Sequence, residues 1–291
     1  MKVGVFLLTS DPATDPAVIA KRAEEVGFAS FWAPEHPIIP TQFSTGYPGS
    51  RDGHIPEGAK RIADPFVALA RASAVTTKIQ LGTGICLVPE RNPLLLAKEI
   101  ASLDNYSGGR FLFGIGAGWL KEETEIMGGD FAHRWTQTRD AILAMKQLWT
   151  TDESEYHGKY YNFPPVISFP KPAHKPHPPV LLGGSSKQVF KRIVERGDGW
   201  VPTISSVEQI RRGRATLNEL ATQVGRDPKS IPIFAFGGPG QFRDRGQIEE
   251  LAQAGAEHAT LWIKSTTKAE ALAEVEELAR LVLPKSNRSG V

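Results

Sequence analysis

The stretch RFLFGIGAGWL, residues 110–120, decides how this 291-residue chain is read. An apolar run of strand length ends in three glycines, Gly114, Gly116 and Gly118, followed by Trp119. Glycines at a strand end either bend the strand, let a helix pack closely, or let a ligand approach the backbone. Because glycine has no side chain, this strand end leaves a slot for a flat ring, and Trp119 can form one wall of the slot.

The glycine spacing excludes one familiar binding loop. A dinucleotide-binding turn needs G-x-G-x-x-G on the first strand-to-helix connection, with an acidic residue about 20 positions on. Residues 114–118 have the spacing G-x-G-x-G, and three complete strand–helix units precede them. A Rossmann dehydrogenase is therefore not expected.

Strand-length apolar runs alternate with helical patterns along the whole chain. Asp15, Asp64 and Asn92 each precede a proline, the pattern of a helix N-cap with proline at the first helical position. The predicted strands are residues 2–8, 29–36, 79–88, 110–118, 179–184, 198–203, 231–238 and 258–264. Eight strands alternating with eight helices predict a parallel sheet closed into a (β/α)8 TIM barrel, as one domain over residues 1–291. Two half-length Rossmann domains are the alternative, because they would show the same alternation of strands and helices.

Two segments interrupt this alternation. Residues 37–63, rich in Pro, Gly and Ser, follow the second strand, and a loop of this length often covers an active site. Residues 151–179 contain EYHGKYYNF and many prolines, which predict a small hairpin and an extended arm. Both are expected to be insertions beside the barrel.

Composition describes an ordinary globular protein. Hydrophobic residues make up 41% and charged residues 23%, and the formal charge of +2 favours neither nucleic acid nor an anionic membrane as partner. No apolar run reaches the roughly 20 residues of a membrane span, and the N-terminus is interpreted as a strand rather than a signal peptide. The single cysteine fits a reducing compartment, so we expect a cytoplasmic protein.

Candidate site residues lie at the predicted strand ends, where barrel enzymes build their sites. His36 can shuttle a proton near neutral pH, although a lone histidine is often structural. Gly183, Gly184 and Ser185 precede a helix whose N-terminus could hold a phosphate, or they form an ordinary glycine turn. Cys86 is interpreted as a small core residue, and no histidine spacing predicts a metal site.

The ordered set of motifs resembles the luciferase-like monooxygenase superfamily, whose barrel enzymes use FMN or the deazaflavin coenzyme F420. The similarity rests on FWAPEH, the run LGTGICLVPERNPLLLAKEIASLDNYSGGRFLFGIGAGWLKEE, YHGKYYNFP, PPVLLGGSS and RGDGW, which together cover nearly the whole chain. Residues 92–119 look most like the F420-dependent branch. The resemblance implies a luciferase-like barrel with insertion loops at its carboxyl mouth, and a homodimer.

The resemblance also implies site residues. A strand bulge with a non-proline cis peptide would fall within Gly84-Ile85-Cys86 and hold the deazaflavin ring. Glu35 and His36 match an acidic–histidine pair near the redox carbon, with Glu35 orienting the cofactor or the histidine. The matching cofactor residues are Gly116, Ala117, Gly118 and Trp119 in the slot, Gly183, Gly184 and Ser185 as the phosphate cradle, and Arg139 on the phosphate side.

One departure from the branch is informative. Its sugar-phosphate dehydrogenases carry a proton-donating glutamate where this chain has Trp119, so we expect a different, more apolar substrate. Lys121, Glu122 and Glu123 are expected to begin the next helix on its solvated side.

The resulting prediction is an F420-dependent oxidoreductase that transfers a hydride between C5 of the deazaflavin and an organic substrate. The alternatives are an FMN-dependent monooxygenase using reduced flavin and O2, and a barrel that binds cofactor without catalysis. An oligoglutamate tail on F420 would favour basic residues at the mouth; the candidates are Arg51, Lys60, Arg61, Lys187 and Lys191.

Overall fold

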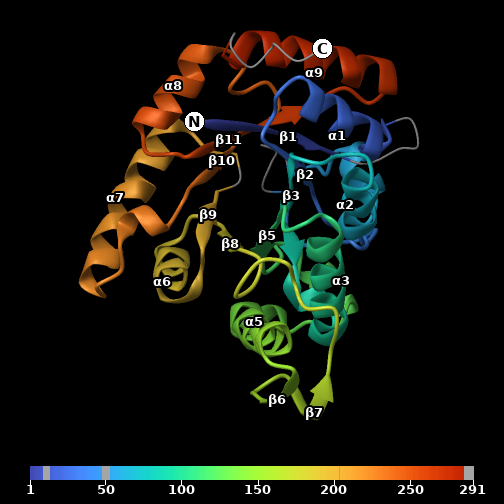
Figure 1. Ribbon diagram of the computed structural model, residues 1–291, viewed down its shortest axis with the longest axis vertical. Helices are drawn as coiled ribbons and strands as arrows, with labels where there is room; N and C mark the ends of the chain where they lie inside the picture. Colours follow the sequence, from blue (N-terminus) through green and yellow to red (C-terminus); the bar gives the residue numbers. More distant parts are fainter. Residues whose placement is uncertain (9–13, 48–52, 203, 285–291) are drawn as a thin grey trace.

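The computed structural model describes residues 1–8, 14–47, 53–202 and 204–284. Eight parallel strands form the predicted barrel in the order β10-β11-β1-β2-β3-β5-β8-β9 (Figure 1). A parallel bridge between Trp200 and Ile233 joins the two ends of this series. The strands are β1 (Lys2–Leu7), β2 (Ser30–Ala33), β3 (Gln80–Thr83), β5 (Phe111–Gly116), β8 (Val180–Gly183), β9 (Gly199–Val201), β10 (Phe234–Phe236) and β11 (His258–Ile263).

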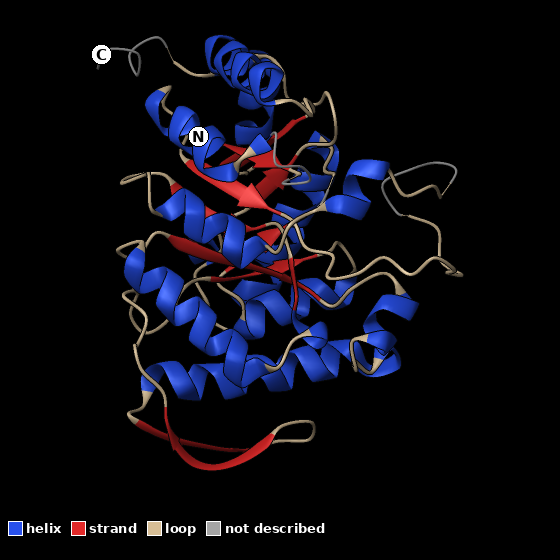
Figure 2. Cartoon of the chain, turned by 90° about the vertical axis from the view of Figure 1, so that its right-hand side faces the viewer, coloured by secondary structure: helices blue, strands red, loops and turns tan. Residues whose placement is uncertain are grey.

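Helices surround the strands, as Figure 2 shows with the strands in red at the centre. The predicted caps are confirmed: Asp15, Asp64 and Asn92 each accept a hydrogen bond from a backbone amide of the helix that they precede. The helices are α1 (Pro16–Glu25), α2 (Pro65–Ser73), α3 (Pro93–Tyr106), α4 (Lys121–Ile126), α5 (Arg134–Thr150), α6 (Lys187–Arg196), α7 (Val207–Gln223), α8 (Arg245–Gln253) and α9 (Lys268–Val282). Short 3-10 turns are η2 (Glu57–Arg61), η3 (Val88–Glu90), η4 (Phe131–His133) and η5 (Pro228–Ser230).

The third predicted strand is divided in the structure. After β3, the Gly84–Ile85 peptide bond is cis, and the chain resumes as β4 (Cys86–Leu87), which pairs with β5. The cis bond lies within the bulge that the family resemblance implied. Between Thr83 and Cys86, the backbone leaves the hydrogen-bond ladder of the sheet. This break places Ile85 at the barrel mouth.

The barrel interior is a packed core rather than a channel. Large side chains fill it; they are Phe6, Trp32, Leu112, Leu181, Val201, Phe234 and Phe236. A second, larger cluster lies between the strands and the surrounding helices. Because apolar side chains occupy the interior, a ligand has room only at an end of the barrel.

The predicted hairpin is confirmed as β6 (Glu153–His157) paired antiparallel with β7 (Asn162–Ile167), below α5 in Figure 1. Asp140 of α5 holds it by accepting hydrogen bonds from the Tyr156 hydroxyl and from the amides of Tyr160 and Tyr161. In the loop of residues 37–63, residues 48–52, including Arg51, lie outside the described residues. Over the described chain, every helix is too short or too polar to cross a membrane.

Candidate active site

A cavity of about 600 Å³ opens at the carboxyl ends of the barrel strands. Most of the predicted site residues line it: Glu35, His36, Gly84, Ile85, Gly116, Ala117, Gly118, Trp119, Gly183 and Gly184. Apolar and aromatic side chains from other strands, loops and α5 complete the wall; among them are Phe6, Leu8, Tyr47, Trp135, Ile204, Phe236 and Trp262. Cys86, Arg139 and Ser185 are not among the lining residues.

Ile85 gives the cavity an apolar wall because glycines stand opposite its side chain. A Cβ on Gly116 would lie 1.9 Å from Ile85 Cδ1, and one on Gly183 would lie 3.4 Å from the same atom. Gly116 at the end of β5 therefore makes room for Ile85. At Gly183, the tighter neighbour of an added Cβ would be the Ile115 carbonyl oxygen of β5, at 3.0 Å.

His36 is held between two side chains at the edge of this cavity. Its Nδ1 lies 2.7 Å from Glu123 Oε2, and Trp119 Nε1 donates to its Nε2 at 3.3 Å. An indole N–H can only donate, so Nε2 must be the unprotonated nitrogen. Nδ1 then carries the proton and donates a hydrogen bond to the Glu123 carboxylate. The two contacts thus define the tautomer, with the lone pair at Nε2 directed at Trp119.

Glu123 corrects the expectation that residues 121–123 lie on a solvated helix face. Glu123 is fully buried, and its second carboxylate oxygen accepts a hydrogen bond from the Ile38 amide at 3.4 Å. Helix α4 turns this side chain toward the loop after β2, while neighbouring Glu122 accepts from the amide and hydroxyl of Ser44.

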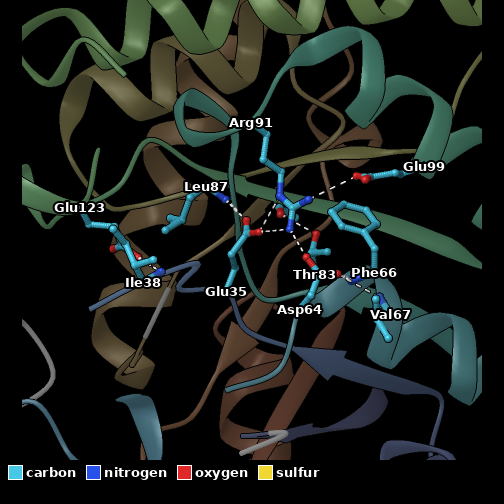
Figure 3. A network of polar contacts seen from close by, with 11 residues as sticks. Glu35, Ile38, Asp64, Phe66, Val67, Thr83, Leu87, Arg91, Glu99 and Glu123 are labelled. Carbon is cyan, nitrogen blue, oxygen red and sulfur yellow. Dashed lines mark hydrogen bonds and ion pairs between the residues drawn. The ribbon is translucent and has the colours of Figure 1, made fainter. Parts of the chain in front are cut away.

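Glu35 does not orient His36, so that part of its predicted role is wrong. Its carboxylate accepts from the Leu87 amide at 2.6 Å and from Arg91 Nε at 2.6 Å. Arg91 also pairs with Asp64 and Glu99, which makes the network in Figure 3. The physical reason is that a buried carboxylate is most stable beside a permanent cation. Glu35 joins the end of β2 to β4, just beyond the cis peptide.

The glycine loop after β8 leads directly into α6. The Trp200 indole N–H donates to the Gly184 carbonyl at 2.6 Å, which fixes the turn, and Ser186 rather than Ser185 caps the helix. Ser185 instead accepts from Gln209 Nε2 at 2.6 Å. The Val189 amide donates to Ser186, and the amides before it in the first turn of α6 are the ones open to an anion.

Arg139 lies in a small pocket beside the main cavity. It shares that pocket with Arg192 and Arg196 of α6 and with Trp135, which also lines the main cavity. The Arg192 guanidinium stacks over the Trp135 ring at 4.7 Å. Burial and the neighbouring Arg196 lower the pKa of Arg192, as expected where cations gather without enough acidic partners. These arginines form a cationic pocket between α5 and α6.

Cys86 is buried, and burial raises the pKa of its thiol well above the ordinary value. Its reading as a core residue is confirmed, and it supplies no side chain to the cavity. Among the basic residues predicted to bind an F420 tail at the mouth, Lys187 and Lys191 are exposed on α6, and Lys60 pairs with Glu57. Within the described ranges, no group of three or more His, Cys, Asp and Glu side chains could hold a metal ion.

Glu90 is a buried carboxyl that the sequence did not single out. It is 3% exposed; one oxygen accepts from the Thr124 hydroxyl at 2.9 Å, and the other has no hydrogen-bond partner. Burial, reinforced by the charge of Glu123, raises the pKa of Glu90 to about 8. The carboxyl stands behind Gly118, where a Cβ would approach it to 3.0 Å.

The family model described as luciferase-like monooxygenase matches residues 1–283. The chain belongs to this family. An uncharacterized protein of Mycobacterium tuberculosis is 35% identical over 283 residues, which cover 96% of this chain and 98% of that relative.

Two relatives have names that state an activity. The FMNH(2)-dependent dimethylsulfone monooxygenase of Pseudomonas putida is 28% identical, over 85% of this chain and 70% of the relative. The F420-dependent hydroxymycolic acid dehydrogenase of Mycobacterium tuberculosis is 28% identical, over 79% of this chain and 60% of the relative. Both are oxidoreductases, which supports an enzyme.

Solved structures share the fold. The F420-dependent tetrahydromethanopterin reductase from Methanopyrus kandleri superposes with a TM-score of 0.78 at 20% identity, over 97% of this chain and 98% of that one. The monooxygenase RslO1 from Streptomyces bottropensis superposes with a TM-score of 0.76 at 21% identity, over 98% and 100%. At these identities, the likeness establishes the luciferase-like barrel.

Proposed function

We propose that this protein is an F420-dependent oxidoreductase that transfers a hydride between C5 of the deazaflavin and an organic substrate. The observation that carries the proposal is His36, whose tautomer is set by Glu123 and whose Nε2 faces the cavity-lining Trp119. A hydride transfer that makes or consumes a hydroxyl group also moves one proton, and a positioned histidine is suited to that task. The F420-dependent relative supports the same reading.

The residues present fit a flat tricyclic ring with an anionic tail. Ile85, packed against Gly116, offers an apolar face, and the turn at Gly183 and Gly184 leads to the amides at the start of α6. When bound, the deazaflavin would supply a two-electron hydride donor or acceptor. The chain would hold the ring, anchor the tail and exchange the proton at Nε2 of His36.

An FMN-dependent monooxygenase on the same barrel is the second candidate. The clustered guanidinium groups of Arg139, Arg192 and Arg196 favour it, because arginines suit the compact phosphate ester of FMN. The monooxygenase relative from Pseudomonas putida supports it as well. The two candidates differ in which cofactor binds.

A fluorescence titration of the purified protein with F420 and, separately, with FMN tests the choice. We expect saturable binding of F420, with FMN at least about tenfold weaker, a preference of roughly 1.4 kcal/mol. Binding of FMN without F420 would overturn the proposal and make oxygen consumption the next assay. Arg192→Gln should then weaken FMN binding, while Arg211→Gln, an exposed residue of α7 that pairs with Glu208, should not.

A further inference from the structure

We propose that Glu90 is a positioning residue for His36. Its protonated carboxyl, held against Gly118 and Thr124, fixes residues 118–124, the segment that carries both side chains bound to the histidine. The inference goes beyond the proposed function, because it concerns how the chain sets its histidine and holds for either candidate cofactor. Three features carry it: the order of contacts along the segment, the protons available to them, and the charges around Glu90.

The first feature is the order of contacts along residues 118–124. The two residues that hold the imidazole lie just inside the ends of this segment. Trp119 donates to Nε2 of His36, and Glu123 accepts from Nδ1. The position of the segment therefore decides both contacts at once.

The two ends of the same segment contact Glu90. The Thr124 hydroxyl lies 2.9 Å from Glu90 Oε1, and a Cβ on Gly118 would lie 3.0 Å from that oxygen. Gly118 has a φ of 82°, which glycine adopts without strain. Each residue that meets Glu90 is thus the chain neighbour of a residue that holds His36. A change at Glu90 reaches the histidine through one peptide bond on either side.

The second feature is the number of protons available. Thr124 Oγ1 lies 2.9 Å from Glu90 Oε1 and 3.1 Å from the Leu120 carbonyl oxygen. One hydroxyl proton can serve both acceptors only as a weaker shared bond. A protonated Glu90 removes this shortage, because it donates to Thr124 and leaves the hydroxyl free to donate to Leu120. Oε2 of Glu90 is buried with no hydrogen-bond partner among the described residues, which also disfavours the charged form.

The third feature is the set of charged groups around Glu90. Glu123 of α4 and Glu35 after β2 add negative charge, while the neighbouring Arg91 is already paired with three carboxylates. Burial, reinforced by the charge of Glu123, raises the pKa of Glu90 to about 8. The carboxyl is therefore protonated at neutral pH and loses its proton in mild alkali.

Helix α5, which packs on η3, contributes Arg134, whose Nε donates to the Gly118 carbonyl at 3.1 Å. This contact steadies one end of the segment and leaves the other end to Glu90. When Glu90 ionises, it repels the Glu123 carboxylate and draws the Thr124 hydroxyl toward itself. Both changes loosen the segment, so the site acquires an alkaline limit from a residue that is not among those lining the cavity.

NMR of the ring nitrogens of His36 tests the inference without any cofactor. The protein is prepared with isotope-labelled histidine, the His36 signals are assigned by their loss in His36→Gln, and the pH is raised from about 7 to about 9.5. We expect one tautomer, with the proton on Nδ1, below about pH 8 and a mixture of both tautomers above it. A single tautomer throughout this range in the wild-type protein would overturn the inference.

Two pairs of variants separate a positioning role from a purely structural one. Glu90→Gln keeps a neutral donor and acceptor at every pH, so the single tautomer should persist to about pH 9.5. Glu90→Ala should show the mixture already at about pH 7. Thr124→Ser keeps the hydroxyl and should behave like the wild-type protein, whereas Thr124→Val should behave like Glu90→Ala. Alkaline mixing that survives in Glu90→Gln, or a wild-type response in Thr124→Val, would contradict the role given to Glu90.

Discussion

Two buried glutamates stand beside the same cavity and differ in the partner that each one has. Glu35 is 4% exposed and is bound by Arg91, whose charge is permanent. Glu123 is fully buried and is bound by His36, whose charge depends on a proton. A carboxylate beside a permanent cation stabilises structure, whereas one beside a histidine can also tune a proton transfer. The partner, rather than the glutamate itself, therefore indicates the role of each carboxylate.

Glu90 differs from both of these glutamates in its partner and its pKa. Glu90 is as buried as the other two, but one of its oxygens has no partner, and its pKa is raised to about 8. Without a cation or a histidine, a buried carboxyl keeps its proton instead of its charge. Three glutamates near one cavity therefore occupy three electrostatic states.

The largest expected effect is on stability, from Glu35→Gln. The change leaves Arg91 with only its more exposed partners Asp64 and Glu99, so we expect the free energy of unfolding to fall by about 3 kcal/mol. Urea denaturation followed by circular dichroism measures it. Glu99→Gln, at the solvent side of the same network, is the control and should cost less than about 1 kcal/mol. Equal losses from both variants would remove the structural role assigned to Glu35.

A smaller effect, on rate, is expected from Glu123→Gln. The amide keeps the shape of the side chain but not the charge that stabilises a protonated His36, so we expect kcat to fall about 10- to 100-fold, with KM nearly unchanged. Steady-state kinetics with F420 and a substrate that the protein turns over would show it. Glu122→Gln, the adjacent residue of α4 that binds Ser44, is the matched control. A matching loss of kcat in this control would place the effect in the loop contact instead.

The last expected effect, from Glu90→Gln, is a change in the slope of the unfolding free energy against pH. The pKa of Glu90 is higher in the folded protein (about 8) than its ordinary value of 4.5, so the folded state binds the extra proton. Its contribution to stability is complete below about pH 4.5 and is lost as the pH rises through about 8, by at most about 1.4 kcal/mol per pH unit. Glu90→Gln removes this loss, because the amide does not titrate.

Unfolding free energies measured between pH 5 and pH 9 test the expected slope. Glu125→Gln, a half-exposed residue of α4, should leave the slope of the wild-type protein unchanged. A wild-type slope that survives in Glu90→Gln would show that another group causes it.

Much of the barrel could be predicted from local sequence signals. The Asp-Pro and Asn-Pro pairs at residues 15, 64 and 92 mark helix starts, because a capping side chain and a proline act within one turn. The division of the third strand at Gly84 and Ile85 followed from family resemblance, since no local pattern announces a break there. Strand ends that share one edge then placed most of the predicted cofactor residues around a single cavity.

The sequence alone determined the order of strands and helices and the gathering of glycines at the carboxyl mouth, because periodicity and capping are local properties. Only the tertiary structure decided which glutamate serves His36. Glu123 is 87 residues away from it along the chain and Arg91 is 56 residues from Glu35, yet the segments that follow β2, β4 and β5 at the carboxyl mouth of the barrel bring each pair into contact. Neighbouring letters, as in Glu35-His36, say little about contact, because successive side chains at a strand end point in opposite directions.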